Sequence, residues 1–552
     1  MLTPTIHLSA GLTAVFVRRT LRAAIGLFAL LFPAIAPCQE PAGATLYNGI
    51  VRPSPWPPRL DAYPSDPVRP PYLVSPPEVI DIGVGRQLFV DDFLIEETTL
   101  ARTYHRAEYY GQNPVLKPDR PWETSTAPSP TAMVFSDGVW YDPAERLFKM
   151  WYMAGYVAGT AYATSKDGIR WEKPELDVVP GTNLVQKGRR DSGTVWLDLA
   201  ADPSERYKMA LWQSGLMVLS ISADGIHWRE AARSGSVGDR TTFFYNPFLG
   251  RWVFSLRYGE GSFGRVRRYW EAEDFLQGAG WQPGDPVRWV GADRADPRRD
   301  DLKTPPQLYN LDCVAYESLL LGLFSIWRGQ PRDRAKPNEV CLGFSRDGFH
   351  WDRPDRRAFL PVSERHGDWN WGNVQSAGGG CLVVGDRLYF YVSGRAGIPG
   401  KTDSGVCSTG LAFLRRDGFA SMDAAGGAGT LTTRPLRFSG KQLFVNVDAA
   451  GGELRAEVLD AEGKVIPPYT RENCMPVQSD GTIEAVRWKG TADLAPIGLK
   501  PVRLRFTLRG GRLFSFWVSP EADGRSNGYV AAGGPGYTGP MDTVGAKALS
   551  GK

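Results

Sequence analysis

One seven-residue motif constrains the fold of this chain more than any other feature of its sequence. The motif reads Ser-x-Asp-Gly-x-x-Trp and occurs in full at residues 165–171, 222–228 and 345–351. In each copy the Asp can accept backbone N–H groups, the Gly can adopt a positive φ, and the Trp can pack between neighbouring sheets. The motif therefore predicts a recurring tight turn and a structural role for its aspartates.

The segments between these turns are typical of short β-strands. Residues 147–152 read Leu-Phe-Lys-Met-Trp-Tyr, residues 207–212 read Tyr-Lys-Met-Ala-Leu-Trp, and aromatic residues make up 12% of the chain. Strands and turns together form units of roughly 50–70 residues, and such a period with several strands per unit is typical of a β-propeller. Five units fit between about residue 126 and residue 425, which predicts five four-stranded blades.

The regions on either side of the repeats differ in composition. Residues 37–78 are rich in Pro and are typical of a linker or an arm along the surface. A strand at 87–95 is expected to close the ring or to pair with its last blade, so the propeller is expected to span 79–425. Alternating strands then predict an antiparallel β-sandwich at 430–518, followed by an irregular Gly-rich tail at 519–552. The expected fold is all-β: a five-bladed β-propeller followed by this C-terminal sandwich.

The N-terminus has the pattern of an export signal. Three arginines precede a short apolar run at 23–32, and small residues follow it. This pattern predicts a signal peptide at 1–36 and a periplasmic or extracellular protein. The run is too short for a stable membrane span. Pro37 argues against Cys38 as a lipoprotein cysteine.

Composition narrows the classes of partner and cofactor. A net charge of +4 is too small to predict a nucleic-acid partner. The cysteines include no Cys-x-x-Cys, and the five histidines show no metal-ligand spacing. We therefore expect no cofactor and no metal site, with a structural Ca²⁺ ion left open. The sequence does not predict the disulfide pattern or the oligomeric state.

The sequence resembles the five-bladed propellers of glycoside hydrolase families 32 and 43, and most closely exported bacterial proteins described as glycosyl-hydrolase-like. The resemblance covers most of residues 86–518. Besides the Asp-Gly turns, it rests on Leu-Phe-Val-Asp-Asp at 88–92, Asn-Pro-Val-Leu at 113–116 and Thr-Arg-Pro-Leu at 433–436. The Asn-Asp-Pro opening and the Glu-Cys pair typical of family 32 are absent. The resemblance implies a carbohydrate substrate and a pair of carboxyl groups as the catalytic machinery.

In such a fold, the loops that lead into the innermost strands meet at one end of an axial channel. The related families place their catalytic acids on the first three blades, which points to Glu123, Asp191 and Asp239, although the order of Asp and Glu is reversed here. The candidate catalytic residues are Glu123, Asp191, Asp239 and Asp312. Aromatic rings stack on sugars, and charged groups bind hydroxyls. The candidate substrate-binding residues are accordingly Trp122, Arg190, Arg240, Tyr309, His366, Asp368 and Trp369.

Each candidate acid also has a structural interpretation. Asp191 and Asp239 each adjoin an arginine and could form a surface ion pair, Glu123 could be an exposed loop acid, and Asp312 could cap a turn. No one of these residues is decisive alone.

The sequence leaves three functions open. The first is an exported glycoside hydrolase acting on oligo- or polysaccharides, for which acids on separate blades favour inversion. The second is a carbohydrate-binding propeller whose catalytic pair has decayed. The third is an inverting glycoside phosphorylase, because residues 113–116 before Trp122 and Glu123 also resemble those enzymes. The sugar, the linkage and exo or endo action are not predicted.

Overall fold

The computed structural model describes residues 43–424 and 426–550, so the expected signal peptide at 1–36 and Cys38 lie outside the described residues. The described chain is all-β, as the sequence predicts. Its α-helices are the single turns α1 (Pro71–Val74) and α2 (Pro121–Thr124). No helix in this part of the chain is long and apolar enough to cross a membrane.

Five antiparallel sheets follow one another along the chain. The first contains β6 (Ala132–Asp142), β7 (Leu147–Ala154), β8 (Gly159–Ser165) and β9 (Leu184–Gln186). The second contains β10 (Gly193–Leu197), β11 (Tyr207–Gln213), β12 (Leu216–Ser222) and β13 (Arg229–Ser236). The third contains β14 (Thr242–Asn246), β15 (Arg251–Glu260), β16 (Gly264–Ala272) and β17 (Val287–Val290).

The fourth and fifth sheets each take one strand from outside this part of the chain. The fourth contains β18 (Gln307–Glu317), β19 (Leu319–Trp327), β20 (Asn338–Ser345) and, from the C-terminal tail, β33 (Tyr529–Val530). The fifth contains β21 (Asn373–Ser376), β22 (Leu382–Val384), β23 (Arg387–Arg395), β24 (Cys407–Arg415) and, from the N-terminal side, β5 (Glu108–Tyr109).

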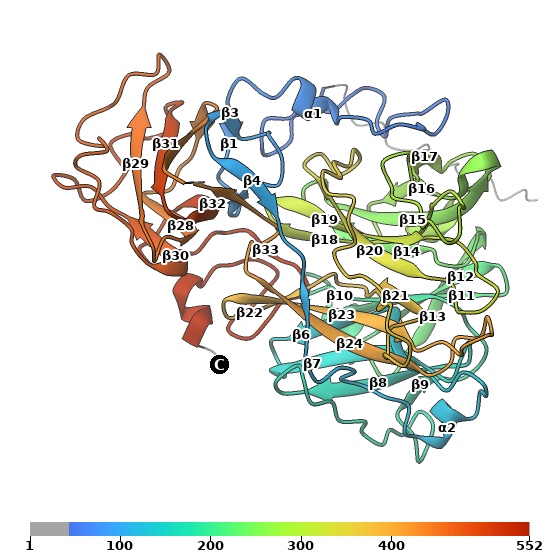
Figure 1. The fold of residues 1–552 in the computed structure, drawn as a ribbon. Helices are drawn as coiled ribbons and strands as arrows, with labels where there is room; N and C mark the ends of the chain where they lie inside the picture. The colour runs from blue at the N-terminus through green and yellow to red at the C-terminus, as the bar shows by residue number, and fades with distance from the viewer. Residues whose placement is uncertain (1–42, 425, 551–552) are drawn as a thin grey trace, which may run out of the picture. The chain divides into compact units, whose positions relative to one another are not determined.

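The first strands of the five sheets surround a common centre. β6 contacts β10, β10 contacts β14, and β14 contacts β18. β21 contacts both β6 and the fourth sheet, so the succession returns to its start (Figure 1). Residues that lead into these strands, although far apart in the sequence, therefore lie near one another.

The repeated turns have the predicted geometry. In the first copy, Asp167 Oδ1 accepts hydrogen bonds from the backbone N–H groups of Ile169 and Arg170, both at 2.8 Å, and Gly168 has a φ of 72°. The other two copies repeat this arrangement. The second turn also joins two sheets, because Trp151 of β7 donates to the carbonyl oxygen of Gly225 at 2.7 Å. A Cβ atom at Gly225 would lie 2.5 Å from the Trp151 ring, so the turn requires glycine there.

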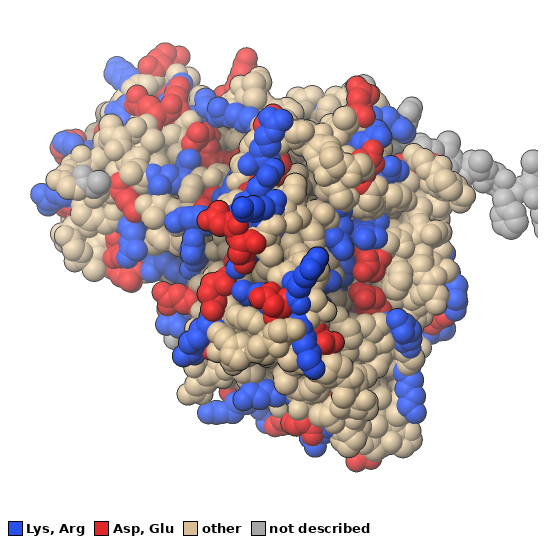
Figure 2. All heavy atoms as spheres, turned by 45° about the vertical axis from the view of Figure 1, so that its right-hand side comes forward, with Lys and Arg blue, Asp and Glu red and all other residues tan. Residues whose placement is uncertain are grey.

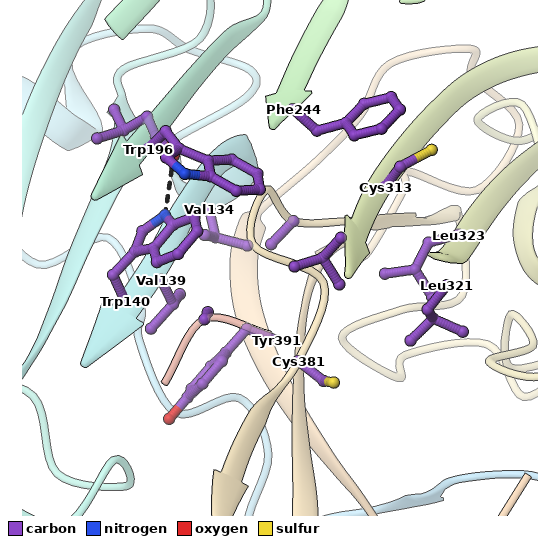
Figure 3. Packing of buried hydrophobic residues seen from close by; sticks show 14 of the residues in the cluster. Val134, Val139, Trp140, Trp196, Phe244, Cys313, Leu321, Leu323, Cys381 and Tyr391 are labelled. Carbon is purple, nitrogen blue, oxygen red and sulfur yellow. Dashed lines mark hydrogen bonds between the residues drawn. The ribbon is translucent and has the colours of Figure 1, made fainter. Parts of the chain in front are cut away.

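The apolar core is shared by all five sheets. Figure 3 shows Trp140, Trp196, Phe244, Cys313 and Tyr391, one residue from each sheet, within a single packed region. Trp140 and Trp196 lie 4.6 Å apart between ring centroids, and Trp140 Nε1 donates to the carbonyl oxygen of Val195 at 2.8 Å. The described cysteines are all buried and unpaired. This core holds the inner strands in a fixed relation to one another.

Two further sheets share a second apolar core. One contains β30 (Asp480–Val486), β28 (Gln442–Asp448), β32 (Arg512–Ser519), β25 (Ala420–Asp423), β4 (Ala101–Tyr104) and β2 (Gln87–Leu88). The other contains β29 (Glu453–Leu459), β31 (Arg503–Arg509), β26 (Ala428–Thr433) and β3 (Ile95–Thr98). A short parallel pair joins β1 (Ile80–Asp81) to β27 (Leu436–Arg437). In Figure 1 the blue strands β3 and β4 lie beside the orange and brown strands.

The segment at 87–95 does not close the ring as expected. β2 pairs with β32 and β3 pairs with β26, while β5 pairs with β24 of the fifth sheet. The physical reason is burial: Phe89, Phe93 and Leu94 are fully buried in the second core. Removing these side chains from water favours pairing there over pairing at the ring.

The N-terminal arm lies along the third and fourth sheets. Trp56 donates to Glu271 at 3.1 Å, Tyr63 donates to the carbonyl oxygen of Arg267 at 3.0 Å, and Tyr72 donates to that of His350 at 3.3 Å. These hydrogen bonds fasten a segment rich in Pro, which cannot form a regular backbone ladder of its own.

A buried ion-pair network fastens the C-terminal tail. Arg416 pairs with Glu317 at 3.0 Å and with Asp542 of the tail at 3.1 Å. Arg86 pairs with Asp417 at 3.0 Å. The side chains of all five residues in this network are fully buried. The tail therefore combines the short strand β33 and this network with otherwise irregular backbone.

Candidate functional site

The inner strand of the first sheet carries an unusually wide bulge. The register of β6 on β7 passes from Met133–Met153 to Gly138–Trp151, so four residues of β6 face one residue of β7. These four residues, 134–137, are named the central segment here, and all of them are buried. Phe135 has a φ of 51°, the left-handed region that a bulge can require.

The central segment contacts the fourth and fifth sheets and the residues that lead into the second and third sheets. The Val134 N–H donates to Thr409 Oγ1 of the fifth sheet at 2.8 Å. Ser136 Oγ accepts hydrogen bonds from Arg240 and from Asn310 of the fourth sheet, both at 2.9 Å. Asp137 pairs with Arg190, which precedes the second sheet, at 2.8 Å. Only a segment at the centre of the ring can reach all of these partners, so the central segment occupies that centre.

Two of the predicted carboxylates lie at or beside this centre and remain partly exposed. Asp191 lies two residues before β10; its Oδ1 atom is buried and has no hydrogen-bond partner. Asp239 precedes β14 and lies 3.6 Å from Arg257, with its side chain 36% exposed. The neighbouring arginines, Arg190 and Arg240, point into the centre and are buried.

Asp312 of β18 lies deeper and is closed off from solvent. Its Oδ2 atom accepts hydrogen bonds from Ser376 at 2.5 Å and from Asn310 at 2.7 Å. Burial raises the pKa of Asp312 to about 6, against the opposing effects of the Ser376 hydrogen bond and the Arg240 charge. Burial also raises the pKa of Asp137, although Arg190 opposes this shift. The centre thus contains carboxyl groups that favour protonation.

Asparagine at position 312 is expected to stabilise the fold at alkaline pH. The folded-state pKa of about 6 exceeds the unfolded value of about 3.9, so the folded state keeps a proton that the unfolded state releases. The stability that this group contributes is present below pH 4 and is lost as pH rises to 6. Asp312→Asn should therefore raise the free energy of unfolding at pH 8 by on the order of 1–3 kcal/mol.

Urea unfolding at pH 4, 6 and 8 checks this result. Asp61→Asn, at an exposed carboxylate on the N-terminal arm, is the control and should behave as the parent protein at every pH. An Asp312→Asn protein with the same pH dependence as the parent would show that folding does not raise the pKa of Asp312.

Four cationic side chains at the centre have no carboxylate within 4.0 Å among the described residues: Arg240, Arg267, Lys336 and Arg395. Lys336 donates to Tyr309 Oη at 2.7 Å, and Arg267 donates to the carbonyl oxygens of Arg240 and Tyr309. Arg395 donates to Tyr156 Oη at 3.2 Å and to Ser404 Oγ at 3.1 Å. Their hydrogen-bond acceptors are therefore neutral.

Tyr309 is the aromatic residue most affected by these cations. Its side chain is only 5% exposed, and burial alone would raise the pKa of its hydroxyl. The charges of Lys336, Arg395 and Arg240 outweigh burial and lower the Tyr309 pKa below its usual value of 10.0. The structure thus brings Arg190, Asp191, Arg240, Tyr309 and Asp312 together around the central segment, with Asp239 at its edge.

Glu123 and Trp122, in contrast, are held in structural contacts within the first sheet. Glu123 lies in α2 and is fully buried, accepting hydrogen bonds from Tyr152 at 2.7 Å and from Lys173 at 2.8 Å. Its second oxygen also accepts the backbone N–H of Asp119 at 2.8 Å. Trp122 donates to Asn183 at 3.0 Å. Both oxygens of Glu123 are committed, so we leave it out of the proposed catalytic pair.

The predicted residues that precede the fifth sheet also have local partners. Asp368 pairs with Arg365 at 2.6 Å, and His366 packs edge-on against Trp371 with ring centroids 5.1 Å apart. Trp369 lies over Gly394 and Gly410 of the fifth sheet, where no side chain larger than hydrogen would fit. These contacts make Trp369 a packing residue on the sheet face.

Sequence reasoning missed the central segment and several of the cations around it. Ser136-Asp137-Gly138 interrupts an otherwise apolar strand, which is the one local sign of the bulge. Lys336 follows β19 and Arg395 ends β23, and neither belongs to a recognisable motif. Charged side chains of both signs are interspersed on the face shown in Figure 2, so net charge does not reveal the buried excess either.

No family model and no curated protein matches this chain. Solved structures do. An N-acetylgalactosamine deacetylase from F. plautii, in complex with blood group B trisaccharide, is 16% identical over 58% of this chain and 95% of its own, with a TM-score of 0.37. A thermostable family-43 glycoside hydrolase is 12% identical over 55% of this chain and 94% of its own, with a TM-score of 0.36.

A fructofuranosidase from Schwanniomyces occidentalis, complexed with fructosylnystose, covers more of the chain. It is 10% identical over 75% of this chain and 96% of its own, with a TM-score of 0.33. The chain therefore resembles glycoside hydrolases of the family 43 and family 32 types, as its sequence motifs indicate. Identities and TM-scores this low carry no argument about the reaction.

Proposed function

We propose that this chain is an exported glycoside hydrolase that acts on oligo- or polysaccharides at the centre of the ring of five sheets. In this proposal the five sheets are the blades of a propeller, and the two further sheets form a β-sandwich. The observation that carries it is the meeting of the loops that hold Asp191 and Asp239, where the Arg240 N–H donates to Ser192 Oγ at 2.8 Å. Arg190, Arg240 and Tyr309 lie beside these loops. Export rests on the signal pattern at 1–36 alone.

Asp191 and Asp239 are the proposed catalytic pair because a substrate can reach them. Of the four acids predicted from the sequence, they are the ones that keep partly exposed side chains. One donates a proton to the leaving oxygen while the other activates water or attacks the sugar. Asp312 serves as a positioning residue, since its hydrogen bonds to Ser376 and Asn310 secure the partners of the central segment.

Inversion is the stereochemical outcome we propose. The two acids precede the first strands of different sheets, an arrangement suited to carboxyl groups on opposite sides of the sugar ring. Carboxyl groups about 6.5–9.5 Å apart leave room for the attacking water, whereas about 5–5.5 Å implies a covalent intermediate. Proton NMR of the first product released, before mutarotation, distinguishes the two outcomes.

A carbohydrate-binding protein without turnover is the second candidate. The observation that favours it is the central segment, which fills the centre of the ring. Asp137 of this segment and Asp312 beside it are both buried. Hydrolysis then depends entirely on the two acids that remain exposed. If these are not positioned for catalysis, the same surface would bind a sugar and release it unchanged.

A screen of the purified protein on paired aryl glycosides and on plant and algal polysaccharides tests the proposal. Hydrolysis that the Asp177→Asn control retains supports it, because Asp177 is exposed and bonded to His227 away from the centre. Release of sugar phosphate only in the presence of inorganic phosphate would replace it with the phosphorylase. Saturable sugar binding with no product over days would replace it with the binding protein.

A further inference from the structure

The centre of the ring holds more buried positive charge than its carboxylates neutralise. Within 4.0 Å among the described residues, its ion pairs join Arg190 to Asp137 and, at its edge, Arg257 to Asp239. Arg240, Arg267 and Arg395 are all at most 3% exposed and lack a carboxylate partner. Lys336, partly exposed, also lacks one. Asp312, with a pKa of about 6, is mostly ionised at neutral pH and offsets one of these charges, although its hydrogen bonds come from Ser376 and Asn310 and not from the cations.

These cations are arranged around one aromatic residue. The Lys336 ammonium lies 4.6 Å from the Tyr309 ring centroid, and the guanidinium of Arg265 lies 5.2 Å from it. The Arg240 guanidinium stacks on Phe135 of the central segment at 3.6 Å and lies 5.8 Å from Tyr309. Two nitrogens of Arg240, Nε and Nη1, are buried without any hydrogen-bond partner. Arg240 thus has N–H groups without acceptors beside the packed rings of Phe135 and Tyr309.

Buried cations without counter-charges are costly. Removing a guanidinium from water costs several kcal/mol unless an anion and hydrogen bonds replace the lost hydration. A binding site can offset this cost through its ligand, since an oxyanion accepts from several arginine and lysine donors at once. Lys336, Tyr156 and Asp191 are partly exposed, so the cluster can be reached from solvent.

We propose that the ring centre contains an oxyanion subsite, formed by Lys336, Arg240 and Arg395 beside Tyr309, that binds the carboxylate or sulfate of an acidic saccharide. This assignment rests on the proposed function and narrows its substrate class. The anionic group of the sugar supplies the counter-charge that the protein lacks there. Tyr309 supports the subsite through its hydroxyl, which accepts a hydrogen bond from Lys336.

The fit to an acidic sugar is better than the fit to a neutral one. A neutral sugar presents hydroxyl groups, which the partly exposed carboxylates Asp191 and Asp239 can bind, but it leaves the four cations without counter-charge. An acidic sugar uses both halves of the site: its hydroxyls face the carboxylates and its anionic group faces the cations. Specificity would then come from the penalty that a neutral sugar incurs at the unfilled cationic half.

Isothermal titration calorimetry of the full chain with matched ligands tests the assignment. The pairs are 4-nitrophenyl glucuronide against glucoside and 4-nitrophenyl galacturonide against galactoside, together with a 6-sulfated galactoside and inorganic phosphate. We expect at least one acidic ligand to bind about tenfold or more tightly than its neutral counterpart, with affinity falling as salt rises. Equal affinity within every pair, or tight binding of inorganic phosphate alone, would overturn the acidic-saccharide assignment.

Variants locate the binding group. Lys336→Met and Arg395→Met should each weaken the acidic ligand about tenfold or more and leave the neutral one unchanged, and Arg395→Lys should recover part of the loss. Arg233→Met, at an exposed arginine paired with Glu230, is the matched control. If Lys336→Met folds and keeps the parent affinity for the acidic ligand, the subsite is elsewhere.

The outcomes for the two proposals are separable. If acidic ligands bind preferentially but no acidic glycoside is hydrolysed, the subsite proposal is supported and the hydrolase proposal is contradicted. If neutral glycosides are hydrolysed and acidic ligands are not preferred, the hydrolase proposal is supported and the subsite proposal is contradicted.

Discussion

Replacing Asp191 with asparagine is expected to lower the turnover number by about 10²–10⁴-fold while leaving sugar affinity within a few-fold of the parent. Asparagine has nearly the same shape and keeps one carbonyl oxygen, but it cannot exchange a proton at the pH of the reaction. The loop should keep its position, because its anchors are the hydrogen bonds of the Asp191 N–H to the Trp212 carbonyl oxygen and of Arg190 to Asp137. A loss confined to turnover would therefore report chemistry and not folding.

Two other acids test whether the loss of turnover is specific to the proposed catalytic pair. Asp239→Asn should produce a loss of similar size, because a carboxyl pair acts as a unit. Asp177→Asn should retain parent activity. If Asp191→Asn hydrolyses the best substrate at half the parent rate or more, Asp191 is no catalytic residue and its position beside Arg190 is structural.

The parts of the fold that the sequence predicts are those governed by local chemistry. Asp167 and Gly168 form their turn through contacts within four residues, so the motif alone is sufficient to recognise it. The same locality explains why Arg190 and Asp191 could be placed at the ring centre: they lie within three residues of the start of a first strand.

The sequence alone does not predict which distant segments pair with each other. The apolar segment at 87–95 could have added to any open sheet edge, and its choice depends on which core buries Phe89 and Phe93. The central segment is a similar case, since its register depends on partners in or beside four other sheets. Lys336 and Arg395 reach the centre only through the tertiary fold, and surface lysines and arginines look identical in sequence.

The chain should be most sensitive to mutation, outside its proposed site, at the buried ion-pair network. Arg416→Met is expected to lower the free energy of unfolding by about 3–5 kcal/mol, because it leaves buried carboxylates without their counter-charge. Arg416 is the shared partner of Glu317 and Asp542, and all three side chains are fully buried. Methionine fills much of the same volume, so the loss would come chiefly from charge.

The pH dependence of this loss identifies its cause. The Arg416 and Arg86 charges outweigh burial and hold the pKa of Asp542 below its ordinary value in the fold. The stability gained from this depressed pKa is present above pH 4 and is lost as pH falls below it. In Arg416→Met that gain disappears, so the deficit against the parent should be largest above pH 5 and shrink towards pH 3.

Denaturant unfolding across this pH range, with hydrogen exchange of residues 526–545, measures both effects. The tail should lose protection first, because Asp542 and Ser526 attach it to Glu317 and Arg416. Arg512→Met is the control: this arginine is 48% exposed and pairs with Asp448, so its loss should cost about 1 kcal/mol or less at every pH. A deficit in Arg416→Met that is independent of pH would assign the loss to packing and would show that the charges of this network contribute little to the attachment of the tail.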